Sequence, residues 1–273
     1  MKTIGLIGYG SMGSMLINGF LKTGVIKPEQ TIVSTRTKSK IESLHVNWPK
    51  LKIADDNRVV VRESDVIFIC VKPNDFKPVL EEIKDEMTAD KHIVSSVGVV
   101  TIASMEKFVE AQISRLMPSL TSEVNAGISL ISHGDQVTED NKDFVNKLLS
   151  EISHVKMIDE AEFELATEIT SCGPGFIASL FEEMTKSALR ANSRFTDEEI
   201  EFMVYETIIG TVKYFEEKRQ SFSDTVDRVA TKGGFTAYGV EVLRDKMPDV
   251  FDKMFERAMF RHGELIETIN KDF

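Results

Sequence analysis

Three glycines near the N-terminus have the spacing of a turn that binds phosphate groups. Gly8, Gly10 and Gly13 form a GxGxxG pattern, with Ser11 and Met12 between the last two, and the pattern follows a strand-like run and opens a helical one. The first glycine permits a tight turn, the second lets the backbone approach a pyrophosphate, and the third lets helix and strand pack closely. The N–H groups at the helix start then face the phosphates. A glycine-rich turn without a ligand is the alternative, but the strand–helix context favours a dinucleotide site made by these five residues.

The segment after the second predicted strand indicates which dinucleotide the site takes. A site for NAD usually has an acid there, which binds the ribose 2′-hydroxyl. No acid occurs between residues 31 and 40, whereas Ser34 and Thr35 supply hydroxyls and two lysines follow Arg36. Hydroxyls and cations suit a 2′-phosphate, which an arginine can hold through two parallel hydrogen bonds. The sequence therefore favours NADP(H), with a solvated basic helix start as the alternative.

Val71, Lys72 and Pro73 close the most apolar strand-like run of the chain. Ligands of an open α/β sheet lie beyond the carboxyl ends of its strands, so we expect this backbone to line the cofactor site on its nicotinamide side. Lys72 has the chemistry of a general acid, but a solvated lysine at a strand end is the interpretation that we favour for its ammonium group.

Two clusters of small residues open predicted helices in the second half of the chain, at residues 171–175 and 231–236. Backbone N–H groups at a helix start can form a nest that binds an anion. The second cluster is therefore a candidate carboxylate site. A plain helix-start turn is the alternative for both clusters.

The elements that would position these residues form an alternating pattern over the first 160 residues. Short β-branched runs predict strands at 3–7, 31–34, 51–53, 66–71, 92–95, 112–117, 127–132 and 154–158. Apolar residues at helical spacing predict helices between them, at 12–23, 38–43, 57–63, 76–87, 102–108 and 139–152. Strand–helix alternation predicts an α/β fold with a doubly wound, mainly parallel sheet.

Strand signals stop near residue 160. Helices are predicted at 160–170, 175–191, 197–217, 223–230, 235–246 and 250–271. Pro174, a capping box of Thr196 and Glu199, and Pro248 mark three of the helix starts. The prediction is a Rossmann-type dinucleotide-binding domain at residues 1–159 and an all-helical domain at 160–273.

The composition limits the class of partner. With 33 basic and 44 acidic side chains the formal net charge is −11, which argues against a nucleic acid or an acidic membrane surface. No apolar run approaches the roughly 18 residues of a membrane-spanning helix. Cys70 and Cys172 make no disulfide framework and the five histidines are scattered, so we expect a cytoplasmic protein without a metal site.

Taken in order, the motifs resemble those of the pyrroline-5-carboxylate reductase family. The resemblance runs over nearly the whole chain, through IGLIGYGSMGSML at the start and the segments at 65–73, 115–118, 170–176 and 229–243. Asn57 falls where such reductases have an asparagine that touches the adenosine part of the cofactor. This succession of motifs is far more specific than any one of them.

The resemblance implies an NADPH-dependent oxidoreductase that reduces pyrroline-5-carboxylate, or a close analogue, to L-proline by hydride transfer to the C=N carbon. It implies a Rossmann domain followed by a helical dimerisation domain, and hence a homodimer or a higher homo-oligomer. The substrate carboxylate would be held by the turn of Thr231, Gly233 and Gly234. Thr236 matches the threonine that hydrogen-bonds near the substrate nitrogen, which makes it the catalytic candidate.

Three motifs depart from the family pattern. Ser119–Thr121 replaces Asn-Thr-Pro, Lys232 and Phe235 replace a proline and a threonine in the glycine-rich turn, and Phe176 replaces a tyrosine. These changes resemble the divergent branch of late-competence ComER proteins of bacilli. Two alternatives therefore stay open: a dinucleotide-binding regulatory protein with little turnover, and an enzyme of the β-hydroxyacid dehydrogenase type, for which Lys186 is the candidate base.

Overall fold

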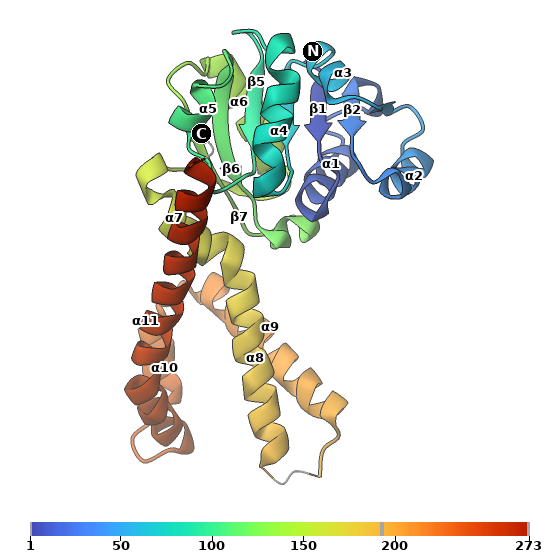
Figure 1. Cartoon of the computed structure of the whole chain (residues 1–273). Helices are drawn as coiled ribbons and strands as arrows, with labels where there is room; N and C mark the ends of the chain where they lie inside the picture. The colour runs from blue at the N-terminus through green and yellow to red at the C-terminus, as the bar shows by residue number, and fades with distance from the viewer. Residues whose placement is uncertain (1, 192–193, 272–273) are drawn as a thin grey trace. The chain divides into compact units, whose positions relative to one another are not determined.

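A computed structural model describes residues 2–191 and 194–271, apart from the side chains of Lys38 and Asn270. These residues contain one eight-stranded sheet of order β3-β2-β1-β4-β5-β6-β7-β8, in which only β6 and β7 are antiparallel (Figure 1). The strands are β1 Ile4–Ile7, β2 Thr31–Ser34, β3 Lys52–Ala54, β4 Val66–Ile69, β5 His92–Ser95, β6 Gln112–Met117, β7 Ile128–His133 and β8 His154–Met157. The predicted α/β class and mainly parallel sheet are confirmed.

Helices cover both faces of this sheet. They are α1 Ser11–Thr23, α2 Lys38–Asn47, α3 Asn57–Arg62, α4 Pro73–Ile83, α5 Ile102–Glu106 and α6 Glu139–Ser150, with 3-10 turns at Pro28–Gln30, Lys84–Glu86 and Leu120–Val124. In β4, Val66 and Phe68 belong to the core that contains α1, α2 and α6, whereas Ile67 and Ile69 belong to the core that contains α3, α4 and α5. The strand is apolar throughout because both of its faces are buried.

The register brings the carboxyl ends of three strands to one level. Ile7, the last residue of β1, pairs with Ser34 of β2 on one side and with Ile69 of β4 on the other. The backbone then holds the next residues too, because the Gly8 N–H donates to Ser34 O at 2.9 Å and the Cys70 N–H donates to Ile7 O at 2.8 Å. Loops that follow β1, β2 and β4 therefore meet at one place.

No strand follows β8 in the described part of the chain. A 3-10 turn, Glu160–Glu162, leads into α7 Phe163–Thr167, a π-helical segment, Glu168–Cys172, and then α8 Gly173–Arg190, α9 Asp197–Lys218, α10 Phe222–Val229 and α11 Phe235–Asn270. The capping box predicted for the start of α9 is confirmed, with Thr196 and Glu199 each accepting a backbone N–H. Among the described residues, no helix is long and apolar enough to cross a bilayer.

Two predicted helix boundaries are wrong. Residues 235–270 form one helix that continues through Pro248. The φ of proline is compatible with a helix, but the lost hydrogen bond and the ring clash cost about 3 kcal/mol, which the other turns of this 36-residue helix outweigh. The chain also turns helically through residues 168–190 without a break, so Pro174 lies in the first turn of α8 and the cluster at 171–175 does not open a free helix end.

The chain divides into two compact units. The first comprises Met1–Pro174 together with Met259–Phe273, and the second comprises Gly175–Ala258. The C-terminal end of α11 belongs to the first unit, where Ile269 joins the core formed with α3, α4 and α5. In the second unit, Ile200 is the one buried side chain among the described residues.

Candidate functional site

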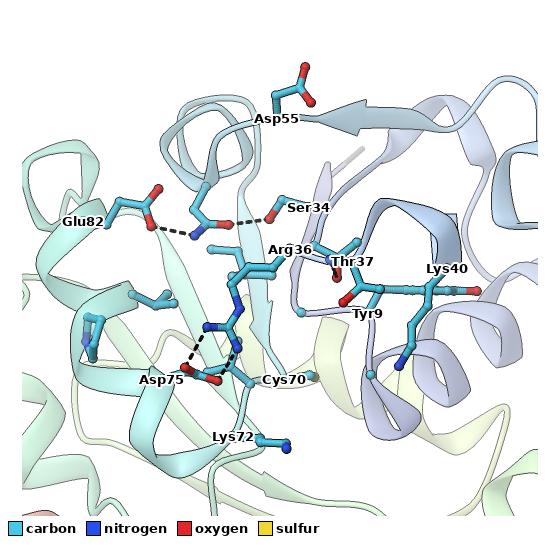
Figure 2. A pocket seen from close by; sticks show the side chains of 18 residues that line it. Tyr9, Ser34, Arg36, Thr37, Lys40, Asp55, Cys70, Lys72, Asp75 and Glu82 are labelled. Carbon is cyan, nitrogen blue, oxygen red and sulfur yellow. Dashed lines mark hydrogen bonds and ion pairs between the residues drawn. The ribbon is translucent and has the colours of Figure 1, made fainter. Parts of the chain in front are cut away.

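A cavity of about 450 Å³ lies where the loops after β1, β2 and β4 meet. Figure 2 shows its lining, which comes from the glycine-rich turn, the β2–α2 loop, the start of α3 and one face of α4. The lining residues are Ile7, Gly8, Tyr9, Gly10, Ser34, Thr35, Arg36, Thr37, Lys40, Asp55, Asn57, Cys70, Val71, Lys72, Asp75, Pro78, Val79 and Glu82. The structure thus brings eight of the predicted cofactor residues to one cavity, while Ser11, Met12, Gly13 and Pro73 lie beside them in α1 and α4.

The glycine-rich turn has the geometry that its sequence predicts. Gly8 adopts a φ of +99°, and a Cβ atom there would lie 2.5 Å from Cys70 O. A Cβ atom at Gly13 would collide with Gly8 O, so helix α1 packs against the turn as closely as the third glycine allows. A Cβ atom at Gly10 would meet nothing within 4 Å, and α1 begins after it with no side-chain cap. The open space at a helix start fits a pyrophosphate.

The predicted 2′-phosphate side is basic and rich in hydroxyls. Ser34, Thr35 and Thr37 line the cavity beside Lys40. Arg36 also lines it, but its guanidinium group is engaged: Nη1 and Nη2 donate to the two carboxylate oxygens of Asp75 at 2.9 and 2.6 Å. The residues fit a phosphate, and the arginine that would hold it has an acidic partner that the sequence did not predict.

Asn57 hydrogen-bonds two polar neighbours that line the cavity, Ser34 and Glu82, both labelled in Figure 2. Its Oδ1 accepts from Ser34 Oγ at 2.6 Å, and its Nδ2 donates to Glu82 Oε2 at 2.7 Å. The preceding Asp56 caps α3 by accepting the Arg58 N–H, and its contact with Arg58 lowers the pKa of the carboxyl to about 2. The helix cap and the hydrogen bonds together fix the Asn57 amide in the lining of the cavity.

Cys70, one of the residues that line the cavity, is uncharged. Burial raises the pKa of the Cys70 thiol to about 12, so the side chain is a neutral thiol at physiological pH. Lys72 is exposed at the N-terminal cap position of α4, and its side chain makes no capping hydrogen bond. Its placement at the cavity edge is compatible with the solvated role that we favour.

The candidate substrate residues lie together in the second unit, in the turn before α11. Gly233 has a φ of +78°, and the Gly234 N–H donates to Thr231 O at 2.9 Å. Thr236 stands in the first turn of the helix. Phe235 has an exposed fraction of 99%, so its side chain does not pack into the core of the single chain.

Asp75 and Glu82 are two of the three lining acids that sequence reasoning missed, the third being Asp55 before α3. The first two are seven residues apart on α4, with Pro78 and Val79 between them, and all four of these α4 residues line the cavity. This i, i+3, i+4, i+7 spacing places them on one helix face. The spacing would have found them once α4 was expected to border the site.

Lys186 lacks the environment of a catalytic base. It lies in α8, where Nζ contacts Glu182 at 2.9 Å and Glu183 at 3.0 Å. The hydrogen bond to Glu182, more than any other contact, raises the pKa of Lys186, whereas a general base needs a lowered one.

The sheet order, the glycine-rich turn and its cavity define a dinucleotide-binding protein of the Rossmann class with an added helical region. The family model described as NADP oxidoreductase coenzyme F420-dependent matches residues 3–98, and the model for the pyrroline-5-carboxylate reductase dimerisation domain matches residues 160–265. The chain is 39% identical over 272 residues to pyrroline-5-carboxylate reductase 3 of Bacillus subtilis, covering 99% of each chain. It belongs to the pyrroline-5-carboxylate reductase family.

Other relatives agree with this assignment. ComE operon protein 4 of Bacillus subtilis is 29% identical, with 99% of this chain and 98% of that one covered. The solved reductase of Coxiella burnetii is 26% identical with a TM-score of 0.87, covering 97% of this chain and 98% of its own. The Plasmodium falciparum reductase, solved with NADP bound, has the same fold at 24% identity, a TM-score of 0.84 and 98% coverage of both chains.

Proposed function

We propose that this protein reduces pyrroline-5-carboxylate, or a close analogue, to L-proline with NADPH. The cavity at the carboxyl ends of β1, β2 and β4 carries the proposal, because it combines a phosphate-binding glycine turn with Arg36 and Lys40. Membership of the reductase family and the 39% identity to a relative named as a reductase support the substrate.

The cofactor residues divide by the part of NADPH that they would hold. The backbone of the glycine-rich turn and the start of α1 would bind the pyrophosphate, through Gly8, Gly10, Ser11, Met12 and Gly13. Ser34, Thr35 and Arg36 would bind the 2′-phosphate, and Asn57 would touch the adenosine part of the cofactor. The backbone of Val71, Lys72 and Pro73 would border the nicotinamide.

Bound NADPH would supply a hydride to the C=N carbon of the substrate. The chain's own contribution is to hold the substrate: Thr231, Gly233 and Gly234 would bind its carboxylate, and the Thr236 hydroxyl would hydrogen-bond near its nitrogen. A protonated iminium carbon is already electrophilic, so catalysis rests mainly on positioning. This explains why no strong acid–base pair is needed.

Two other functions receive less support. A competence regulator with little turnover is disfavoured because identity to the reductase, at 39%, exceeds the 29% to ComE operon protein 4. An enzyme of the β-hydroxyacid dehydrogenase type would need Lys186 as a base, and the two glutamates that pair with it oppose that role.

We further propose that residues 1–159 and 160–273 are the two functional domains, although the compact units divide at Gly175. A homodimer is supported by the match to a dimerisation domain and by the exposed apolar side chains of the second unit. The net charge of −11 and the two free cysteines support a cytoplasmic protein that binds a small molecule and no nucleic acid.

A steady-state assay tests the function directly. The purified chain, given pyrroline-5-carboxylate, should oxidise NADPH with a higher kcat/KM than NADH, read from the nicotinamide absorbance. Thr236→Ser, which keeps the hydroxyl, is the matched control for Thr236→Val, which removes it at nearly constant shape. Absence of substrate-dependent oxidation with either cofactor would contradict the proposal.

A further inference from the structure

Asp75 is the acid that holds Arg36 inside the cofactor cavity. Both carboxylate oxygens accept, Oδ1 from Nη1 at 2.9 Å and Oδ2 from Nη2 at 2.6 Å, and Figure 2 shows the guanidinium turned toward Asp75. The exposed fraction is 82% for the Arg36 side chain and 28% for Asp75. The pair is therefore well aligned but largely solvated on the arginine side.

The pair spans the position of the cofactor site. Arg36 follows β2, and Asp75 lies in the first turn of α4, which follows β4. Strands β2 and β4 flank β1 on opposite sides. Arg36 and Asp75 both line the cavity at the carboxyl ends of these strands. The ion pair thus joins the two walls of the cavity.

We propose that Asp75 competes with the 2′-phosphate of NADPH for Arg36 and so limits the preference for NADPH over NADH. The inference rests on the proposed role of Arg36 in binding that phosphate. Carboxylate and phosphate both take the guanidinium fork through two parallel hydrogen bonds, so one excludes the other from the same edge.

The competition weakens the binding of NADPH and leaves the binding of NADH unaffected. NADPH must take Arg36 from Asp75 before the guanidinium can hold the phosphate, whereas NADH has a hydroxyl there and can leave the ion pair intact. A solvated ion pair contributes little, and a phosphate monoester carries more charge than a carboxylate, so the exchange still favours the phosphate. Asp75 weakens NADPH binding moderately and leaves NADH binding unchanged.

Binding titrations of the full chain test this without reference to turnover. Dissociation constants for NADPH and NADH are measured by cofactor fluorescence, and that for 2′,5′-ADP, which carries the phosphate without the nicotinamide, by calorimetry. Asp75→Asn should lower the constants for NADPH and 2′,5′-ADP about two- to fivefold, the range for an exposed pair, and change that for NADH by less than about twofold.

Three variants provide controls. Asp75→Glu keeps the carboxylate and should stay close to wild type. Glu81→Gln removes the same charge from the same helix at an exposed position outside the cavity lining, and should leave all three constants unchanged. In an Arg36→Met background, Asp75→Asn should no longer tighten NADPH binding, because the group that Asp75 competes for is gone. Melting curves confirm that each variant is folded.

The possible results separate cleanly. Weaker NADPH binding by Asp75→Asn would mean that Asp75 positions Arg36 for the phosphate, and equal tightening of both cofactors would mean that the pair simply obstructs the cavity. Tightening that persists in the Arg36→Met background would mean direct repulsion between Asp75 and the phosphate. Each of these three results would contradict the proposal that Asp75 and the 2′-phosphate compete for Arg36. If Arg36→Met alone leaves the ratio of NADPH to NADH affinity unchanged, the proposed role of Arg36 fails instead.

Discussion

Recognition of the cofactor phosphate and recognition of the substrate each depend on single residues. Local patterns identified the glycine-rich turn and Arg36, because their spacing is a property of a few consecutive residues. Asp75 and Glu82 line the same cavity only because α4 packs beside β1 and β4, and no local sequence motif identifies them. The identity of the arginine was therefore predictable, and its acidic partner was not.

Charge reversal at Arg36 should change cofactor preference. Arg36→Glu places a negative charge against the 2′-phosphate and beside Asp75, which should weaken NADPH binding by about 2 kcal/mol or more. The NADH dissociation constant should change little, as measured by fluorescence titration. Arg36→Lys, which keeps the charge but loses the planar fork, should lie between wild type and Arg36→Glu. An unchanged preference ratio in the glutamate variant would remove Arg36 from the phosphate site.

Phe235 occupies a position where the family has a threonine, at the start of α11. Because its side chain is almost fully exposed in the chain, Phe235→Thr should change the unfolding free energy by less than about 0.5 kcal/mol. On the substrate-site proposal it should raise kcat/KM for pyrroline-5-carboxylate. Melting and steady-state rates are measured together, and a marked loss of stability without a gain in rate would mean that Phe235 is buried in the working assembly.

The neighbouring Thr236 provides the opposite test of the same turn. Thr236→Ala should lower kcat/KM by about tenfold or more, because a hydrogen bond to a charged group contributes about 1.5–3 kcal/mol. If kcat/KM is untouched, the turn is not the substrate site.

At the scale of elements, the strands were predictable and two helix boundaries were not. Every expected strand occurs. The six inner strands are largely buried in a sheet covered on both faces, whereas the edge strands β3 and β8 are mostly exposed. Pro248 and Pro174 predicted helix starts, yet helix continues through both, although a proline inside a helix costs about 3 kcal/mol. Local sequence cannot show which proline a helix will tolerate.

The buried Ser114 hydroxyl joins three strands through two histidines, and one of them, His92, predicts how stability depends on pH. His92 Nε2 of β5 and His133 Nδ1 of β7 each lie 2.7 Å from Ser114 Oγ of β6. Burial, and then the nearby His133, lower the pKa of His92 from 6.5 to about 3. Below about pH 6.5, His92 binds a proton in the unfolded chain but stays neutral in the folded chain. The contribution of His92 to the free energy of unfolding is therefore complete above that pH and is lost as the pH falls toward 3.

The melting temperature should therefore fall as the pH decreases from about 6.5. His92→Asn, which can still hydrogen-bond Ser114, should show a shallower decrease over the same range, whatever its stability at neutral pH. Melting curves in buffers of constant ionic strength provide the comparison. An identical pH dependence in the variant would show that other groups dominate acid unfolding.

At the scale of the whole molecule, the second unit is poorly buried for a helical body. Large apolar side chains on all four of its described helices are exposed, among them Phe202 at 64% and Tyr238 at 67%. Exposed apolar surface of this extent is uncommon on monomers, and a symmetric pairing of identical chains is the usual way to cover it. We therefore expect at least a dimer.

Light scattering measures this assembly directly. The mass at micromolar concentration should be at least about twice that of the 30.7 kDa chain. Phe202→Glu, which puts a charge on the exposed apolar surface, should shift the distribution toward the single chain, while Glu81→Gln on α4 should not. A single-chain mass for the wild type would contradict the assembly.

The central claim is that hydride passes from NADPH to the C=N carbon of pyrroline-5-carboxylate. The most direct measurement supplies NADPH deuterated at C4 of the nicotinamide and follows the product by mass spectrometry. The expected product is L-proline that carries one deuterium, on the ring carbon that was part of the C=N bond. Tight NADPH binding without labelled proline would contradict it.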